Sequence, residues 1–176
     1  KNINDLSRGD LNVLRKKMGF LFQGAALYDS MSVRENLAFP LRDLKDFSEE
    51  NTESAIQEAL KNVGLEKAID LMPSELSGGM KKRVALARTL ILKPEIILYD
   101  EPTTGLDPIT GKEISRLICE LGEKYNTSSI VISHDMHCVK IVADRIVILI
   151  DGKCYAEGTY ESLQNSQDTK IRQYFE

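Results

Sequence analysis

Two adjacent carboxylates follow an apolar run in the second half of the chain. Residues 95–99 are typical of a buried strand and lead directly into Asp100 and Glu101. In this arrangement the first carboxylate, Asp100, can hold Mg²⁺ directly or through water. The second, Glu101, would lie one residue farther out and could orient or deprotonate an attacking water molecule. Taken alone, the pair could equally be a solvated turn before Pro102.

Polar side chains follow two further apolar runs. Gln23 ends the run 19–22, and His134 follows the run 129–133. Alone, Gln23 could be a loop residue and His134 a helix-entry residue. Ligands of open α/β sheets bind beyond the carboxyl ends of the strands, so we expect these side chains to meet Asp100 and Glu101 at one edge. There Gln23 could contact the metal or the water, and His134 could donate to a terminal phosphate oxygen.

A second anion site is suggested by Ser77-Gly78-Gly79, where a helix is expected to begin. A serine cap followed by two glycines exposes backbone N–H groups at a helix N-terminus, where negative charge is favoured. Each glycine costs up to about 1 kcal/mol of helix propensity relative to alanine, which a close approach to phosphate would explain. A plain N-cap is the alternative, and Asp107-Pro108 has the same two explanations.

The hydrophobic pattern predicts the elements that must position these residues. Apolar runs at 19–23, 95–99, 129–133 and 145–150 indicate strands. Helices are expected at 1–16 with Ser7 as N-cap, at 51–63, at 77–92 and from Pro108. Asp151-Gly152 is typical of a two-residue hairpin turn. Continuous apolar strands separated by helices indicate an α/β protein with a parallel sheet covered on both faces.

Composition limits the function classes. The chain has 176 residues, a formal net charge of −4 and 42% hydrophobic residues, which is ordinary for one globular domain. Its mild acidity argues against broad electrostatic binding to nucleic acid. The three cysteines, Cys119, Cys138 and Cys154, contain no C-x-x-C pair, so neither a disulfide framework nor a zinc site is predicted. No apolar run approaches the ~20 residues of a membrane span. These features favour a cytosolic protein.

Together the motifs resemble those of the ABC ATPases. Residues 76–80 (LSGGM) resemble the signature, 96–102 the Walker B strand with its catalytic glutamate, and 105–107 the D-loop. Gln23 resembles the Q-loop glutamine, and 133–135 contain the counterpart of the switch histidine. Residues 22–31, 35–36 and 39–41, together with Met80, are similar to those of the ATPases of Mla-type (Mce-associated) lipid transport systems in bacterial envelopes.

The resemblance implies a P-loop NTPase-like fold and a mechanism that needs two copies. Two ATPase subunits close head to tail around two ATP molecules with Mg²⁺. Ser77, Gly78 and Gly79 of one subunit cap the nucleotide held by the other, and Asp107 belongs to the D-loop. The predicted organisation is a partial ATP-binding core at 1–28, a small helical subdomain at 29–92 and the remaining core at 93–176.

The resemblance also implies partners. Transmembrane permease subunits would dock on residues 24–41, with Tyr28 and Phe39 as contacts, and the protein would lie on the cytoplasmic face of the inner membrane. Packing within the helical subdomain is the alternative for these two aromatic residues. An amino-acid or metal-ion importer is the alternative to lipid transport. Chromosome-maintenance ATPases are excluded, because too few residues separate Gln23 from Ser77 to hold long coiled coils.

One departure from the family pattern is large. No G-x-x-x-x-G-K-[ST] motif, the Walker A phosphate loop, occurs in the chain. We interpret the chain as the later part of a longer ATPase and expect it not to hydrolyse ATP alone; a non-catalytic, regulatory ABC-like domain is the alternative. A chain without the first strands of the sheet would leave a strand edge and an apolar face uncovered. We therefore expect oligomerisation, strand exchange or partial disorder.

Overall fold

The computed structural model describes residues 2–42 and 48–176 and confirms the α/β class. Its centre is a parallel sheet in the order β1 (Met18–Leu21), β2 (Ile96–Asp100), β3 (Ser128–Ile132). The register pairs Leu21 with Tyr99 and Tyr99 with Val131, so the three strands end at one edge. This edge brings together the segments on which the predicted chemistry depends.

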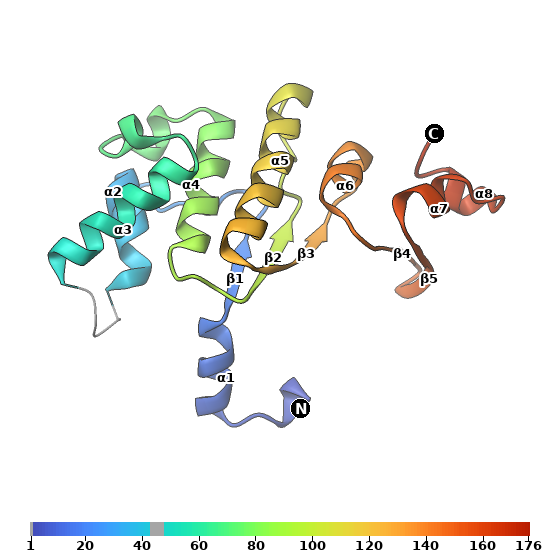
Figure 1. Ribbon diagram of the computed structural model, residues 1–176, viewed down its shortest axis with the longest axis horizontal. Coiled ribbons are helices and arrows are strands. Elements are labelled where there is room, and N and C mark those ends of the chain that lie inside the picture. Colours follow the sequence, from blue (N-terminus) through green and yellow to red (C-terminus); the bar gives the residue numbers. More distant parts are fainter. Residues whose placement is uncertain (1, 43–47) are drawn as a thin grey trace.

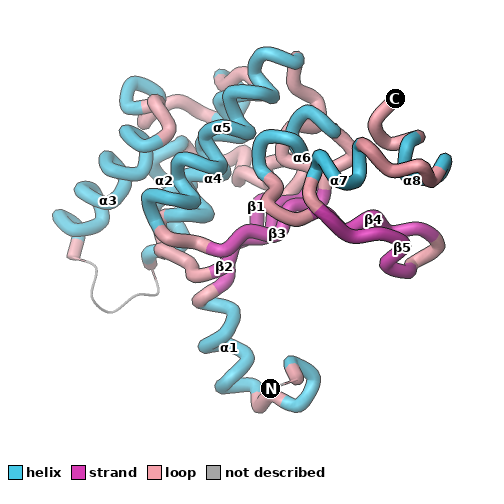
Figure 2. The backbone as a smooth tube through the Cα atoms, turned by 45° about the vertical axis from the view of Figure 1, so that its right-hand side comes forward, coloured by secondary structure: helices cyan, strands magenta, loops and turns pink. Residues whose placement is uncertain are grey.

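Helices pack on one face of this sheet. Ile97 and Tyr99 of β2 point to that face and are buried in the main hydrophobic cluster together with residues of α4 (Gly78–Leu90) and α5 (Pro108–Tyr125). Figure 2 shows α4, α5 and α6 on the same side of the strands. The expected helix starts are confirmed, with Ser77 and Asp107 as N-caps. The remaining α-helices described before the C-terminal region are α1 (Arg8–Lys16), α2 (Val33–Ala38), α3 (Glu49–Asn62) and α6 (Met136–Val142).

The opposite face of the sheet is open in the described part of the chain, so the expectation of helices on both faces is wrong for these residues. Side chains alternate along a strand, and the register places Phe20, Leu98 and Ile130 side by side on this face. Phe20 is 43% exposed, Ile130 59% and Ile132 64%. The described residues therefore show the uncovered apolar face that we expected, while the expected oligomerisation stays a prediction.

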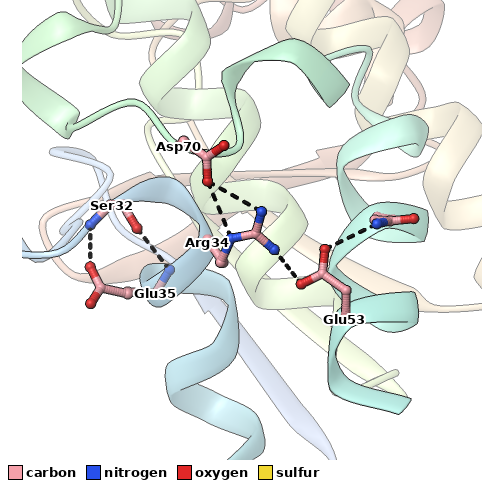
Figure 3. Close-up of polar contacts among 6 residues, drawn as sticks. Ser32, Arg34, Glu35, Glu53 and Asp70 are labelled. Atoms are coloured by element: carbon pink, nitrogen blue, oxygen red, sulfur yellow. Dashed lines mark hydrogen bonds and ion pairs between the residues drawn. The ribbon is translucent and has the colours of Figure 1, made fainter. Parts of the chain in front are cut away.

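The helices between β1 and β2 join the same core as the sheet. Leu37 of α2, Leu60 of α3 and Leu86 of α4 are buried in one cluster with Leu21 and Tyr99. The boundaries of a separate subdomain at 29–92 stay a prediction. Ion pairs at the surface connect the elements of this region. Arg34 donates to Glu53 of α3 and to Asp70, and Ser32 and Glu35 form a capping box at the start of α2 (Figure 3).

The C-terminal region forms a smaller unit of its own. β4 (Ile146–Ile150) pairs antiparallel with β5 (Lys153–Gly158), which confirms the hairpin and its Asp151-Gly152 turn. β4 does not join the parallel sheet, so its assignment to that sheet is wrong. Ile148 packs instead on Leu163 of α7 (Tyr160–Gln164) and Ile171 of α8 (Thr169–Arg172), in a cluster distinct from the main one. Figure 1 shows this unit at one end of the molecule, beyond α6.

The N-terminal helix is shorter than predicted. α1 begins at Arg8 after the Ser7 cap, a 3₁₀ turn occupies Ile3–Asp5, and Lys1 lies outside the described residues. In the ranges that the structure covers, no helix is both long and apolar enough to cross a membrane.

Candidate functional site

Glu101 turns the chain sharply at the end of β2. Its φ is 48°, in the left-handed region, and its N–H donates to the carbonyl of Ile132 (2.9 Å). The carboxylate then receives three hydrogen bonds. The hydroxyl of Thr104 donates to Oε2 (3.0 Å), and the backbone N–H of His134 donates to Oε1 (3.2 Å). Nδ1 of the His134 ring lies 2.7 Å from the same Oε1. The structure thus brings together the predicted pair, Glu101 and His134.

The environments of these two side chains differ. The Glu101 side chain is only 17% exposed, whereas that of His134 is 78% exposed. The hydrogen bond to Glu101 and the negative charge of its carboxylate raise the pKa of His134. A protonated ring that donates through Nδ1 to Glu101 keeps a second N–H, on Nε2, for another acceptor. The pair can therefore present a hydrogen-bond donor to an anionic oxygen.

Asp100 lies on the other side of β2 from the helices, because it alternates with Tyr99. It is half-buried, and among the described residues none donates a hydrogen bond to its carboxylate. Mg²⁺ binds through one or two carboxylates and keeps several waters or substrate phosphate oxygens. A carboxylate with unused oxygens fits such an ion. The described residues hold no group of three or more His, Cys, Asp and Glu arranged for a metal, so the remaining ligands would come from water and substrate.

Gln23 lies at the same edge, two residues beyond Leu21, the β1 partner of Tyr99. The strand stops at Leu21 rather than at Gln23 as predicted. The Gln23 residue is exposed, and its backbone carbonyl accepts a hydrogen bond from Nζ of Lys82 (2.6 Å). The register of the sheet therefore places Gln23 at the same edge as the carboxylates, and the hydrogen bond from Lys82 of α4 holds its backbone there.

Ser77, Gly78 and Gly79 lie against the start of α5. The Ser77 hydroxyl accepts from the Met80 N–H (3.2 Å), as an N-cap does. A Cβ on Gly79 would lie 2.6 Å from Cγ2 of Thr110, so close packing within the chain accounts for this glycine without a ligand. Among the described residues, no hydrogen bond joins Ser77, Gly78 or Gly79 to Glu101 or His134.

Asp107 caps α5. Its carboxylate accepts from the N–H groups of Ile109 and Thr110, both at 3.0 Å, and from the Thr110 hydroxyl. The hydrogen bonds from Thr110 lower the pKa of Asp107. Asp107 is thus the N-cap of α5, one of the two roles that the sequence allowed. Thr110, which donates to Asp107, is also the residue on which Gly79 packs.

Three polar residues at the site were not predicted from the sequence. Lys82 is buried and donates to the backbone carbonyls of two loops. Arg88 donates to the carbonyl of Ala25 (3.0 Å). Thr103 donates to the carboxylate of Asp135 (2.9 Å), the residue that follows His134. Helical spacing is the signal that could have found Lys82. It precedes Leu86 and Leu90 by four and eight positions, on the buried stripe of α4.

The aromatic residues of the segment 24–41 lie at the surface. The rings of Tyr28 and Phe39 are in contact, with centroids 4.8 Å apart, and both side chains are exposed. The Arg88 guanidinium lies over Tyr28 and that of Arg42 over Phe39. Both rings therefore pack within the helical region and are also partly exposed at the surface, so the permease contact and the packing alternative both stay predictions.

Comparisons with known proteins agree with the motifs. A family profile described as "ABC transporter" matches residues 2–104. The intermembrane phospholipid transport system ATP-binding protein MlaF of Haemophilus influenzae is 45% identical over 174 residues, which are 99% of this chain and 66% of that protein. MlaF of Escherichia coli K12 is 42% identical over 176 residues, or 100% of this chain and 65% of that protein. The chain thus spans about two thirds of these relatives.

Solved structures agree in fold. A subunit of the cbiONQ ABC transporter complex of Clostridium perfringens superposes with a TM-score of 0.84 at 31% identity, covering 90% of this chain and 63% of that one. A dimeric ATP-binding cassette bound to ADP and Pi gives a TM-score of 0.77 at 35% identity, covering 89% and 68%. With the profile matching more than half of the sequence, the chain belongs to the ABC transporter family.

Proposed function

We propose that the chain is part of the ATP-binding and hydrolysing subunit of an ABC transporter that moves lipids in a bacterial envelope. The observation that carries the proposal is the 2.7 Å contact between Glu101 and His134 at the carboxyl edge of the sheet. Sequence similarity to the ATP-binding proteins of phospholipid transport systems supports the lipid substrate. Relatives named as methionine import proteins are less similar, at 38% identity, which favours lipid transport over amino-acid import.

In this proposal Glu101 orients the attacking water. An ionised carboxylate offers about four acceptor positions, and internal donors occupy three of them here. One position remains for an O–H of water, so the carboxylate can accept a proton as the water attacks. Glu101 favours the protonated form of His134, and in that form the ring can donate its second N–H to the terminal phosphate of ATP.

Asp100 and Gln23 would hold Mg²⁺, which supplies positive charge to offset that of the phosphates. A second copy of the subunit would contribute Ser77, Gly78 and Gly79 to the same nucleotide. The dimeric cassette with ADP and Pi supports this arrangement, since it places two ABC subunits together with hydrolysis products. Asp107 would hold the D-loop between the two copies.

The segment 24–41 would contact the permease subunits through Tyr28 and Phe39. Their exposure and mutual contact support this role, because an exposed aromatic pair is typical of a protein-binding surface. The subunit would then lie at the cytoplasmic face of the inner membrane, bound to its partners there.

The test is ATP turnover by the complete product of the gene that carries this sequence. Glu101→Gln should abolish turnover and leave ATP binding intact, and His134→Ala should lower kcat by about 10²-fold or more. Turnover that survives Glu101→Gln would refute the role of Glu101. As a matched control, Glu113→Gln removes a carboxylate on the outer side of α5, and it should leave kcat unchanged.

Nucleotide binding by the 176-residue chain is a separate measurement. In a titration with a fluorescent ATP analogue and Mg²⁺, we expect no saturable binding below about millimolar, since the chain holds no Walker A motif. Micromolar binding would contradict this and would assign phosphate binding to the Ser77-Gly78-Gly79 helix terminus.

A further inference from the structure

Lys82 is a buried cation in the first turns of α4, the helix that begins at Ser77-Gly78-Gly79. The residue is 5% exposed. Its Nζ donates to the backbone carbonyl of Gln23 (2.6 Å) and to that of Glu101 (3.1 Å). One side chain thus joins α4 to two loops that lie far apart in the sequence.

These two loops leave adjacent strands at equivalent places. Leu21 pairs with Tyr99, so Gln23 and Glu101 each lie two residues beyond a paired position. At Glu101 the backbone turns into the left-handed region, where a non-glycine residue is held only by its surroundings. The ammonium of Lys82 binds the carbonyl of this same residue, so it stabilises the turn that aims the Glu101 carboxylate at His134.

Two backbone carbonyls, rather than a carboxylate, receive the hydrogen bonds of this buried charge. Among the described residues no carboxylate accepts a hydrogen bond from Lys82, and burying a charge without an ion-pair partner costs free energy. Burial lowers the pKa of Lys82, and the negative charges of Asp100 and Glu101 act in the opposite direction. A methionine would fill a similar volume at this position without the cost of burying a charge.

We propose that Lys82 is a positioning residue that couples the signature end of α4 to the backbone of Glu101 and Gln23. A displacement of α4 would then move the Glu101 carbonyl with it, so contacts made by Ser77-Gly78-Gly79 and the orientation of the Glu101 carboxylate change together. This inference rests on the proposed ATPase function for its effect on turnover. The anchoring of the two loops stands on the hydrogen bonds alone.

The first experiment measures the anchoring, without nucleotide. Lys82→Met removes the ammonium and keeps most of the side-chain volume. Lys81→Met is the matched control, because it makes the same change one position earlier, where the side chain makes no hydrogen bond among the described residues. Amide hydrogen exchange should accelerate at residues 22–25 and 101–104 in Lys82→Met only. Equal exchange in the two variants would overturn the anchoring.

The second experiment measures the coupling, in the complete protein. Lys82→Met should lower kcat about tenfold or more and leave KM for ATP within about twofold, and Lys82→Arg should restore a large part of kcat. Ser77→Ala should lower kcat less in the Lys82→Met background than in the wild type, since coupled residues are non-additive. A merely structural lysine would lower the melting temperature but leave the two kcat effects multiplicative.

The outcomes separate the two proposals. A wild-type protein without ATP turnover refutes the proposed function, while hydrogen exchange still decides the anchoring. Normal turnover in wild type and Lys82→Met alike refutes the coupling and leaves the function standing. If Lys82→Met does not fold, Lys82→Gln, which can reach one carbonyl, should give an intermediate kcat, and a wild-type kcat would overturn the inference.

Discussion

Gly79 and Thr110 lie so close together that a Cβ on Gly79 would be 2.6 Å from Cγ2 of Thr110. The contact joins the second residue of α4 to the third residue of α5. Real Cβ atoms do not approach a methyl group this closely, so a larger residue at position 79 requires a shift of the Thr110 side chain or of one of the two helices.

Gly79→Ala should therefore destabilise the fold by about 1 kcal/mol, because overpacking costs about 1–3 kcal/mol and improved helix propensity offsets less than about 1 kcal/mol of it. Urea unfolding monitored by circular dichroism measures this. Gly9→Ala is the control, since Gly9 is also the second residue of its helix and a Cβ there has no neighbour closer than 3.8 Å. It should be neutral or stabilising.

The explanation predicts a rescue. Thr110→Ser removes the Cγ2 methyl and keeps the hydroxyl that donates to Asp107. The double variant Gly79→Ala/Thr110→Ser should recover most of the lost stability. If the double variant is no more stable than Gly79→Ala, the loss of stability has a cause other than the clash with Cγ2 of Thr110.

His134 should titrate above its ordinary value of 6.5, because the Glu101 carboxylate favours the protonated ring. The contact then stabilises the fold fully below pH 6.5 and ceases to do so as the pH rises through the raised pKa. Proton NMR of the ring resonances, assigned with a His137→Gln variant, measures the value. In Glu101→Gln the pKa of His134 should fall toward 6.5; an unchanged pKa would mean that the two side chains are apart in solution.

The C-terminal unit should open independently of the main core. Ile171, Ile148 and Leu163 form a hydrophobic cluster separate from that around the parallel sheet. Ile171→Ala should cost about 2 kcal/mol or more, and the loss of amide protection should be confined to residues 146–176. Hydrogen exchange with mass spectrometry resolves this. A matching loss of protection in α4 and β2 would show that the two clusters unfold as one.

The open face of the sheet should drive self-association of the chain. Ile130, 59% exposed beside Phe20 and Leu98, contributes to a continuous apolar surface. Ile130→Thr keeps a β-branched side chain and should shift the concentration dependence of light scattering toward the monomer. Ile109→Thr, at an exposed position on α5, should not. Equal scattering by the wild type, Ile130→Thr and Ile109→Thr would show that the chain associates through another surface.

Much of this architecture could be predicted from the sequence, because local signals decide it. The caps at Ser77 and Asp107, the apolar runs of β1 to β3 and the Asp151-Gly152 turn each act within a few residues. The meeting of Glu101 with His134 followed from one topological rule, since parallel strands end at a common edge.

Long-range packing accounts for what could not be predicted. The apolar run 146–150 has the composition of a sheet strand, but its partner is the following segment rather than β3. Lys82 lies in the basic run Lys81-Lys82-Arg83, a pattern typical of a solvent-exposed helix face. Lys82 is nevertheless buried, because two loops distant in sequence pack over its side chain. The packing of Gly79 against Thr110, which is distant in sequence, could not be predicted either, and the phosphate contact expected of Gly79 stays a prediction.

The left-handed backbone at Glu101 ties stability and activity to a single dihedral angle. An L-residue with a φ of 48° costs about 1 kcal/mol relative to glycine. Replacement by glycine would relieve that cost and remove the carboxylate at the same time. Under the proposed function, selection for a more robust fold and selection for turnover therefore oppose each other at this residue, and a chain that drifted toward stability alone would lose this carboxylate.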